Sequence, residues 1–448
     1  MILSFLTLGA MLMLKSAAAV RNSAVLLPSN DPVSIIIHSP TADFYDQPEN
    51  ISSYKPGDVI RTREVGEELS GLIKGIPSIS VKAFHQMLYR TTNTNGEPIA
   101  AMTSIFVPDK ANPNTLLSYQ CSYDTASVDY VPSYGFQAGA NVTEIDDIIF
   151  ITAALKKGWY VVTADYEGLN SQFTDGLISG YATLDAIRVA LGTTSITGLN
   201  AKPILTAWGY SGGTIPTGWA AELQASYAPE LDFSGIAIGG VIANLTASII
   251  DIGNGGHFSG LAFSGITGLS RAYPDLAASV DRHLIPSKAA EFRKIGSASQ
   301  SEASDMGKGK KVWDYFDIGE DMVHDPAFVF AASQSGIMGQ HGSPKSPLYV
   351  YHAKGDEVCP VADVTDLVDK YCNAGATIQY EINTSGGHVE EALAGSAGAF
   401  EWLEDRMKGE AVSDQGECTT EDVKVSVLSW DVIRAFGSEV AAVFIDLF

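Results

Sequence analysis

The chain has 448 residues and a formal net charge of −24 at pH 7, with 46% hydrophobic and 18% charged residues. This composition is typical of a compact globular protein and argues against a disordered chain, and the length allows one large domain or two of ordinary size. The negative charge argues against nucleic acid and anionic membrane surfaces as partners, because phosphates would be repelled over the whole molecule. A neutral substrate is favoured.

Residues 1–19 are predicted to be a secretory signal peptide, which implies a secreted, extracellular protein. The run from Met1 to Leu14 is almost wholly apolar but too short to span a bilayer, and Ala17-Ala18-Ala19 offers a cleavage site before Val20. No basic residue precedes the run, and Lys15 separates it from the cleavage site. An uncleaved anchor or a buried helix is therefore the alternative.

Sequons and cysteines are compatible with secretion. The candidate glycosylation sites are Asn50, Asn141, Asn244 and Asn383. The four cysteines, which allow three pairings if all are oxidised, are Cys121, Cys359, Cys372 and Cys418. The sequence does not choose among these pairings. No cysteine spacing indicates zinc, and we expect neither a metal nor a cofactor.

The first part of the mature chain is predicted to be an N-terminal arm, residues 20–80, in which prolines, glycines and polar residues separate short helical pieces. Two β-rich runs, 81–90 and 99–107, are joined through Asn93-Thr94-Asn95-Gly96, which predicts a hairpin. Residues 116–119 form a further strand, and a polar, aromatic loop follows over 120–134.

Strands then alternate with helices. The predicted helices cover 145–157 and 181–191, and the predicted strands cover 159–164, 204–208, 233–238, 348–351 and 378–382. This alternation is typical of an α/β fold with a mostly parallel central sheet and helices on both faces. We expect its core in two parts, residues 81–243 and 347–412.

Residues 244–346 interrupt the alternation with a stretch rich in Gly, Ser and Ala. We predict an inserted cap or lid, because an insertion at this point emerges beside the carboxyl ends of the strands, where open α/β sheets bind ligands. A surface excursion without a role in catalysis is the alternative. Residues 413–448 are a tail with a β-prone piece at 423–430 and an apolar end at 440–448, predicted to be a flap on the substrate channel or edge packing.

The stretch 205–213 predicts a buried strand that runs into a G-x-S-x-G turn, Gly209-Tyr210-Ser211-Gly212-Gly213, and then a helix. A serine on so tight a turn sits at a strained backbone angle, and the flanking glycines let neighbouring elements pack past it. With 43 glycines in the chain, a chance match is the alternative. The strand–turn–helix context favours a nucleophile elbow with Ser211 as the nucleophile.

The chain order nucleophile, acid, base directs the search for the partners of Ser211. Of the histidines after it, His257, His283, His324 and His341 fall in or at the edge of the insert, and His352 lies inside a strand, where a structural role is favoured. His388 follows a strand in a loop of small residues and is the predicted general base. The predicted acid is Asp356, after a strand and a short turn; helix capping is its alternative role, and Glu357, Asp363 and Asp366 are the other candidates.

An acyl transfer also needs two donors for the oxyanion. One is the backbone N–H of Gly212, the residue after the nucleophile, and the other is expected from the loop 120–124. No HGGG stretch occurs in that loop, so the motif alone does not choose the second donor.

With these residues placed, the sequence resembles the fungal secretory lipase family, the lipase-A type of α/β-hydrolase. The resemblance runs from about Asp43 to Cys418 and rests on stretches that agree in order: 117–120 with Tyr123-Asp124, 158–162 leading to 165–168, 209–213, 226–231, 352–360 and Gly387-His388. It implies Ser211, Asp356 and His388 as the triad, and the backbones of Asp124 and Gly212 as oxyanion donors. It also implies a lid, a C-terminal flap across an acyl tunnel and a Cys372–Cys418 disulfide, whereas Cys121 and Cys359 match no second bridge of the family.

We therefore expect a monomeric carboxylic ester hydrolase that acts on a neutral ester, either at a lipid interface or in solution. Typical members of the family resemble triacylglycerol lipases, but the family also includes esterases that deacetylate fungal metabolites such as trichothecenes. The Gly, Ser and charged residues of the insert, such as Lys308-Gly309-Lys310-Lys311, slightly favour soluble or small-acyl esters. An inactive hydrolase fold that only binds ligands is the alternative from another class, and a peptidase is an alternative among serine hydrolases.

Overall fold

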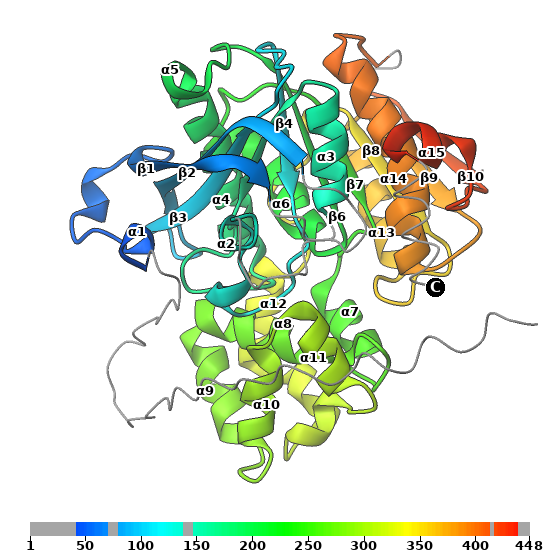
Figure 1. Ribbon diagram of the computed structural model, residues 1–448. Helices are drawn as coiled ribbons and strands as arrows, with labels where there is room; N and C mark the ends of the chain where they lie inside the picture. Colours follow the sequence, from blue (N-terminus) through cyan, green and yellow to red (C-terminus); the bar gives the residue numbers. More distant parts are fainter. Residues whose placement is uncertain (1–41, 70–78, 138–146, 413–415, 438–448) are drawn as a thin grey trace, which may run out of the picture. The chain divides into compact units, whose positions relative to one another are not determined.

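A sheet of ten strands forms the centre of the described part of the chain, which in this computed structural model comprises residues 42–69, 79–137, 147–412 and 416–437 (Figure 1). The strands are, in their order across the sheet, β1 (Val59–Leu69), β2 (Ile79–Thr92), β3 (Pro98–Val107), β5 (Tyr160–Ala164), β4 (Thr115–Gln120), β6 (Ile204–Tyr210), β7 (Phe233–Gly239), β8 (Leu348–Ala353), β9 (Ile378–Asn383) and β10 (Cys418–Val423). The pairs from β1 to β5 are antiparallel, and every later pair is parallel. The predicted mostly parallel sheet and its β2–β3 hairpin are confirmed.

The central strands are buried along their whole length because both faces of the sheet are covered. All residues of β4, β5 and β8 are buried. On β6 the side chain of Trp208 packs against Phe150 and Phe400, whereas Gly209 faces Thr217. Since successive strand residues point to opposite faces, helices lie on both sides of this strand.

The covering helices follow the strands in chain order. One group consists of α4 (Gly176–Gly192) and α6 (Thr214–Tyr227), which pack on each other, and the other group includes α3 (Ile148–Lys156), α14 (His388–Met407) and α15 (Trp430–Phe436). α13 (Val361–Asn373) packs on β9. The short helices are α1 (Ala42–Tyr45), η1 (Ile51–Ser53), η2 (Val128–Tyr130), α2 (Pro132–Gly135), α5 (Thr194–Thr197) and η3 (Ser211–Gly213).

The insert between β7 and β8 is helical and has a hydrophobic core of its own (Figure 1). It contains α7 (Leu245–Ile252), α8 (Ser259–Ala272), α9 (Pro274–His283), α10 (Ala289–Gly296), α11 (Gln300–Gly307), η4 (Val312–Tyr315), η5 (Gly319–His324) and α12 (Pro326–Ser335). Backbone hydrogen bonds from Leu245 to Gly336 and from Met338 to Ala243 join its two ends. The two chain segments that connect the insert to the sheet therefore lie side by side.

Two sequence predictions differ from the structure. The second half of the predicted N-terminal arm is the edge strand β1, whose polar, charged residues hid its pairing with β2. The tail forms its strand at Cys418–Val423 and not at 423–430, where α15 begins instead at Trp430. β10 is exposed along most of its length, so burial gave its sequence no apolar pattern.

A disulfide joins Cys372, at the end of α13, to Cys418, at the start of β10, and so confirms that pairing. Cys121 and Cys359 are free and buried. None of the described helices has the length and apolar character that a membrane crossing requires. The signal peptide, Asn141 and the apolar end 440–448 lie outside the described residues.

Candidate active site

The turn after β6 holds Ser211 in a conformation that few non-glycine residues adopt. Its φ is 50°, in the left-handed region, and the chain passes directly from β6 through η3 into α6. A Cβ on Gly209 would lie 2.2 Å from the carbonyl oxygen of Gly213, and a Cβ on Gly213 would lie 2.2 Å from that of Gln120. Both glycines are therefore required by the close backbone approach.

Three predicted site residues meet at this turn. The Oγ of Ser211 lies 2.7 Å from Nε2 of His388, and Nδ1 of His388 lies 2.7 Å from Oδ2 of Asp356. Ser211 follows β6, Asp356 follows β8 and His388 begins α14 after β9, so all three lie at the carboxyl edge of the parallel strands. The fold thus brings them into one hydrogen-bonded series.

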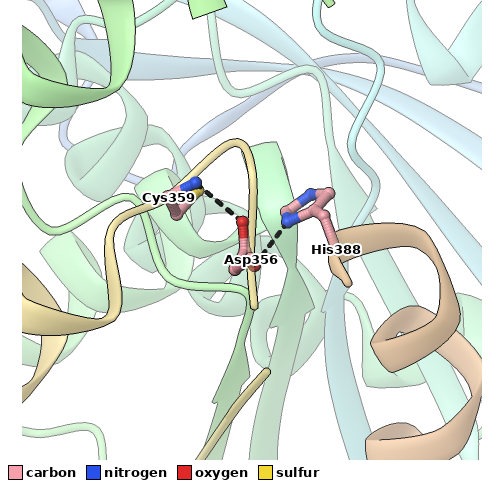
Figure 2. Close-up of side chains that lie close together, drawn as sticks. All are labelled: Asp356, Cys359 and His388. Atoms are coloured by element: carbon pink, nitrogen blue, oxygen red, sulfur yellow. Dashed lines mark hydrogen bonds and ion pairs between the residues drawn. The ribbon is translucent and has the colours of Figure 1, made fainter. Parts of the chain in front are cut away.

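The turn after β8 holds Asp356 with both carboxylate oxygens engaged. Oδ1 accepts the backbone N–H groups of Val358 (2.9 Å) and Cys359 (2.7 Å), and Figure 2 shows Asp356 between Cys359 and the His388 ring. Burial acts to raise the pKa of Asp356, but the charge and hydrogen bond of His388 outweigh it and hold that pKa below its ordinary value. Asp356 is therefore ionised at neutral pH.

His388 is buried, and burial acts to lower its pKa. The charge of Asp356, its hydrogen bond and the nearby carboxylates of Glu357 and Asp124 act the other way and raise the pKa of His388 above its ordinary value. Because Nδ1 faces a carboxylate, it carries the proton, and in the neutral ring Nε2 presents its lone pair to Ser211.

The alternative acids do not contact the ring of His388. Glu357 accepts the backbone N–H of His388 (2.9 Å) and so reaches its backbone rather than its ring. Asp363 lies 3.5 Å from the amide of Asn244, and Asp366 is exposed. Asp356 is thus the carboxylate that contacts the imidazole of His388.

His352 supports the Asp356 turn. Its buried ring accepts the backbone N–H of Val241 at Nδ1 (3.2 Å), so Nε2 carries the proton and donates to the carbonyl of Cys359 (2.9 Å). Nε2 also lies 3.6 Å from Oδ2 of Asp356. The expected structural role agrees with these contacts.

The loop after β4 brings Asp124 against Gly212. Asp124 also has a positive φ, 39°, and is 2% exposed. Its Oδ1 has no hydrogen-bond partner among the described residues, and a Cβ on Gly212 would lie 1.7 Å from it. Its Oδ2 accepts from the amide of Gln300 (3.0 Å). Burial, followed by the charge of Asp147, raises the pKa of Asp124 to about 7.

A cavity of about 350 Å³ lies beside Ser211 and His388. The core contributes both polar and apolar residues to its lining: Ser122, Asp124, Asp147, Phe150, Tyr210, Val358, Val389 and Ala392. The insert lines it with His257, Phe258, Leu261, Gln300, Ser301, Ser304 and Asp305. Apart from His257, which was considered as a base, no motif singles out these insert residues, because they act only through their place in the folded chain.

Asp356, Cys359 and His388 place one ligand atom each within 4.8 Å of one another, an arrangement that could in principle hold a metal. Both carboxylate oxygens and the facing ring nitrogen already form hydrogen bonds (Figure 2). Burial raises the pKa of the Cys359 thiol well above its ordinary value, whereas a metal ligand must be the thiolate. The donor set therefore fits a hydrogen-bonded acid–base pair better than a metal.

The described sequons differ in exposure. Asn50 is exposed, whereas Asn383 is 1% exposed and its amide donates to Glu391 and to the carbonyl of Val425. Asn244 is half-buried, and its amide lies 3.5 Å from Oδ1 of Asp363. A glycan needs space at the amide, which exposed Asn50 has and buried Asn383 lacks.

A family model described as "Secretory lipase" matches residues 135–415, which is more than half of the chain. The chain belongs to the secretory lipase family. Among similar proteins, the trichothecene C-3 esterase of Fusarium sporotrichioides is 36% identical over 93% of this chain and 92% of its own length. Lipase A of Arthroderma benhamiae is 33% identical over 90% of this chain and 84% of its own.

A solved structure of Candida antarctica lipase A in its closed state is similar with a TM-score of 0.78 and 25% identity, over 92% of this chain and 95% of that one. This likeness and the parallel sheet identify the α/β-hydrolase fold. Together with the family and its named lipases and esterase, they make this secretory lipase homologue a carboxylic ester hydrolase.

Proposed function

We propose that the protein is a secreted serine esterase that hydrolyses a neutral ester through an acyl-enzyme on Ser211. The observation that carries the proposal is the series Ser211 Oγ, His388 and Asp356, with 2.7 Å at each of its two hydrogen bonds. It lies on an elbow with positive φ and opens on a cavity of about 350 Å³. Nucleophilic catalysis by serine requires an adjacent base and a group that orients that base.

The reaction begins when His388 Nε2 accepts the proton of the Ser211 hydroxyl while Oγ attacks the ester carbonyl carbon. The tetrahedral intermediate collapses, the C–O bond to the alcohol breaks, and the imidazolium returns its proton to the leaving alcohol. Water then attacks the acyl-enzyme by the same route, with His388 as base, and releases the carboxylic acid. Asp356 holds the ring in its Nδ1–H tautomer and stabilises the imidazolium.

The oxyanion of both tetrahedral intermediates is stabilised by the backbone N–H groups of Gly212 and Asp124 in this mechanism. Gly212 follows the nucleophile, and Asp124 lies directly against it on the loop after β4. Fixed donors in a site that excludes water are the largest single contribution in many acyl transfers. The close packing of Asp124 on Gly212 supports a preformed pair.

A second candidate narrows the substrate to a small acyl ester of a compact alcohol. The cavity is of the size that takes one small molecule, and its insert side carries His257, Gln300, Ser304 and Asp305. Polar groups of this kind suit an oxygenated alcohol better than long acyl chains. A deacetylase acting on a fungal metabolite of the trichothecene kind fits these features, since the chain is 36% identical to a trichothecene C-3 esterase.

The insert acts in this proposal as a cap over Ser211, and the tail acts as a flap. In support, helices α8 and α11 supply one side of the cavity lining. Phe436 of α15 packs edge-to-face against Phe150, which also lines the cavity. A monomer with no cofactor is sufficient for the chemistry, because one chain supplies every group named above.

Secretion would follow from removal of residues 1–19. The family description and the apolar start of the chain support it. Expression in a fungal host checks this step: the medium should contain protein that begins at Val20 and carries a glycan on Asn50, not on Asn383. Retention of the protein in the cell pellet would contradict secretion.

The test of function is a series of nitrophenyl esters from acetyl to palmitoyl, with wild type beside Ser211→Ala. We expect the variant to lose activity by several orders of magnitude at unchanged thermal stability. Preference for acetyl esters in solution would support the compact-ester candidate, whereas preference for long chains with a rise at an emulsion interface would support a lipase. A wild type that fails to react with a fluorophosphonate would instead point to an inactive binding protein.

A further inference from the structure

Gln300, on the first turn of α11 in the insert, reaches across the cavity to the loop after β4. Its amide donates to Oδ2 of Asp124 over 3.0 Å, and both residues line the cavity. No motif or family description names this residue. Its partner is the residue whose backbone N–H is the second oxyanion donor in the proposed function.

Asp124 needs to be held in place. Its φ of 39° is strained for a residue with a side chain, and a strained backbone persists only when its surroundings fix it. On one side its carboxyl packs against Gly212, and on the other side its Oδ2 is held by Gln300. The hydrogen bond to Gln300 and the packing on Gly212 thus hold the carboxyl from two sides and restrict the strained backbone that carries the N–H.

The same two segments make further contacts. The Thr125 hydroxyl donates to the carbonyl of Ala298 (2.6 Å), and the Tyr130 hydroxyl donates to Glu302 (3.2 Å). These contacts dock the start of α11 on the loop, but neither reaches Asp124. They provide a matched comparison, because Glu302 lies two residues from Gln300 on the same helix.

We infer that Gln300 is a positioning residue for ester hydrolysis, through which the insert fixes the Asp124 backbone N–H beside that of Gly212. The inference rests on the proposed function. The insert then contributes to transition-state stabilisation and does more than cover the substrate, since its α11 supplies the hydrogen bond that orients an oxyanion donor.

The charged and titratable groups around the Gln300–Asp124 pair belong to several elements. They are Asp147, Glu167, Tyr166, His388, Cys359 and Asp305. The neutral amide is the group that can donate to Asp124 in this acidic surrounding at every pH. A carboxyl at position 300 could donate only while it holds a proton, and two facing carboxylates would repel one another.

The experiment compares kcat and KM for a nitrophenyl ester in wild type, Gln300→Met, Gln300→Glu and the control Glu302→Met. Gln300→Met keeps length and loses the donor, so we expect kcat to fall by about 10- to 100-fold while KM stays within about threefold. The control should stay within about twofold of wild type in both constants. Gln300→Glu should approach wild type at pH 5.5 and fall to the level of Gln300→Met at pH 8, each variant being divided by wild type at the same pH.

Equal losses in Gln300→Met and Glu302→Met would overturn the inference, because a docking role alone predicts them. Unchanged kcat in Gln300→Met, or a constant ratio of Gln300→Glu to wild type across pH, would overturn it too. If Gln300→Met does not fold, Gln300→Glu at the two pH values carries the test alone. Ser211→Ala in parallel separates the two ideas: its full activity would refute the proposed function, whereas its inactivity beside a normal Gln300→Met would refute only the role of Gln300.

Discussion

Replacing Asp356 with Asn changes a hydrogen-bond pattern and almost nothing else, so it tests the proposed role of this residue sharply. In wild type, Oδ1 accepts the N–H groups of Val358 and Cys359, and Oδ2 accepts Nδ1–H of His388. An asparagine has one oxygen, and two backbone donors fix it on the side of Val358 and Cys359. Its NH₂ group must then face His388.

That NH₂ group forces the wrong tautomer on His388. A donor opposite Nδ1 makes Nδ1 the acceptor, and the ring proton moves to Nε2, which can no longer accept the hydroxyl proton of Ser211. The equivalent change in a serine protease lowers kcat by about 10⁴-fold, and the same logic predicts a loss of about 5 kcal/mol of transition-state stabilisation here. KM should change little, since Asp356 does not line the cavity.

Steady-state kinetics with nitrophenyl acetate measures this loss, and the melting temperature shows that the fold is intact. The matched control is Glu357→Gln, because Glu357 accepts the backbone N–H of His388 and does not set the tautomer of its ring. We expect the control to retain kcat within about tenfold. A kcat of Asp356→Asn within tenfold of wild type would refute the tautomer argument, and a larger loss in Glu357→Gln would move the acid role to that residue.

Three further outcomes follow from the structure. Cys418→Ser should lower the free energy of unfolding by about 2–4 kcal/mol, since the bond to Cys372 closes a segment with a separation of 46 residues; urea unfolding measures this, and an unchanged midpoint would contradict it. Burial raises the pKa of Asp165 to about 7, so its protonated form stabilises the fold fully below about pH 4 and that stability is lost as pH rises towards 7. Calorimetry should therefore show that, between about pH 4 and pH 7, the melting temperature of Asp165→Asn falls less steeply than that of wild type. Equal slopes in the two proteins would contradict this prediction. Because the pKa of His388 is raised, the acid limb of kcat/KM should have its midpoint above about pH 6.5, and a midpoint below that value would show that the ring is not held by Asp356.

The elbow could be predicted from sequence because its chemistry is local. A side chain at Gly209 would clash with the backbone of Gly213, and one at Gly213 would clash with the backbone of Gln120 on the adjacent strand β4. The glycines of the motif therefore follow directly from the geometry of the turn. Asp356 and His388 are not local, but each follows a strand of the parallel sheet. Once the strands were assigned, the edge at which they end placed both residues near Ser211.

Other features could not be predicted because they depend on contacts that carry no sequence pattern. β1 pairs with β2 through its backbone, and its polar residues, such as Arg61, Thr62 and Glu64, give the sequence no apolar alternation. Gln300 contacts Asp124 across 176 positions, and a single amide in a Gly- and Ser-rich insert has no signal of its own. Asn383 matches a sequon, but its burial follows from the packing of β9 against Glu391 and the tail.

The formal net charge of the sequence does not describe the charge at the active site. The formal value of −24 counts every carboxyl as ionised, including Asp124. Burial raises the pKa of Asp124 to about 7, so below that pH this carboxyl is mostly neutral although it lies against Gly212. An anion there would oppose the oxyanion that forms on the substrate, whereas a neutral carboxyl does not. The pocket beside Ser211 therefore becomes less negative as the pH falls below 7.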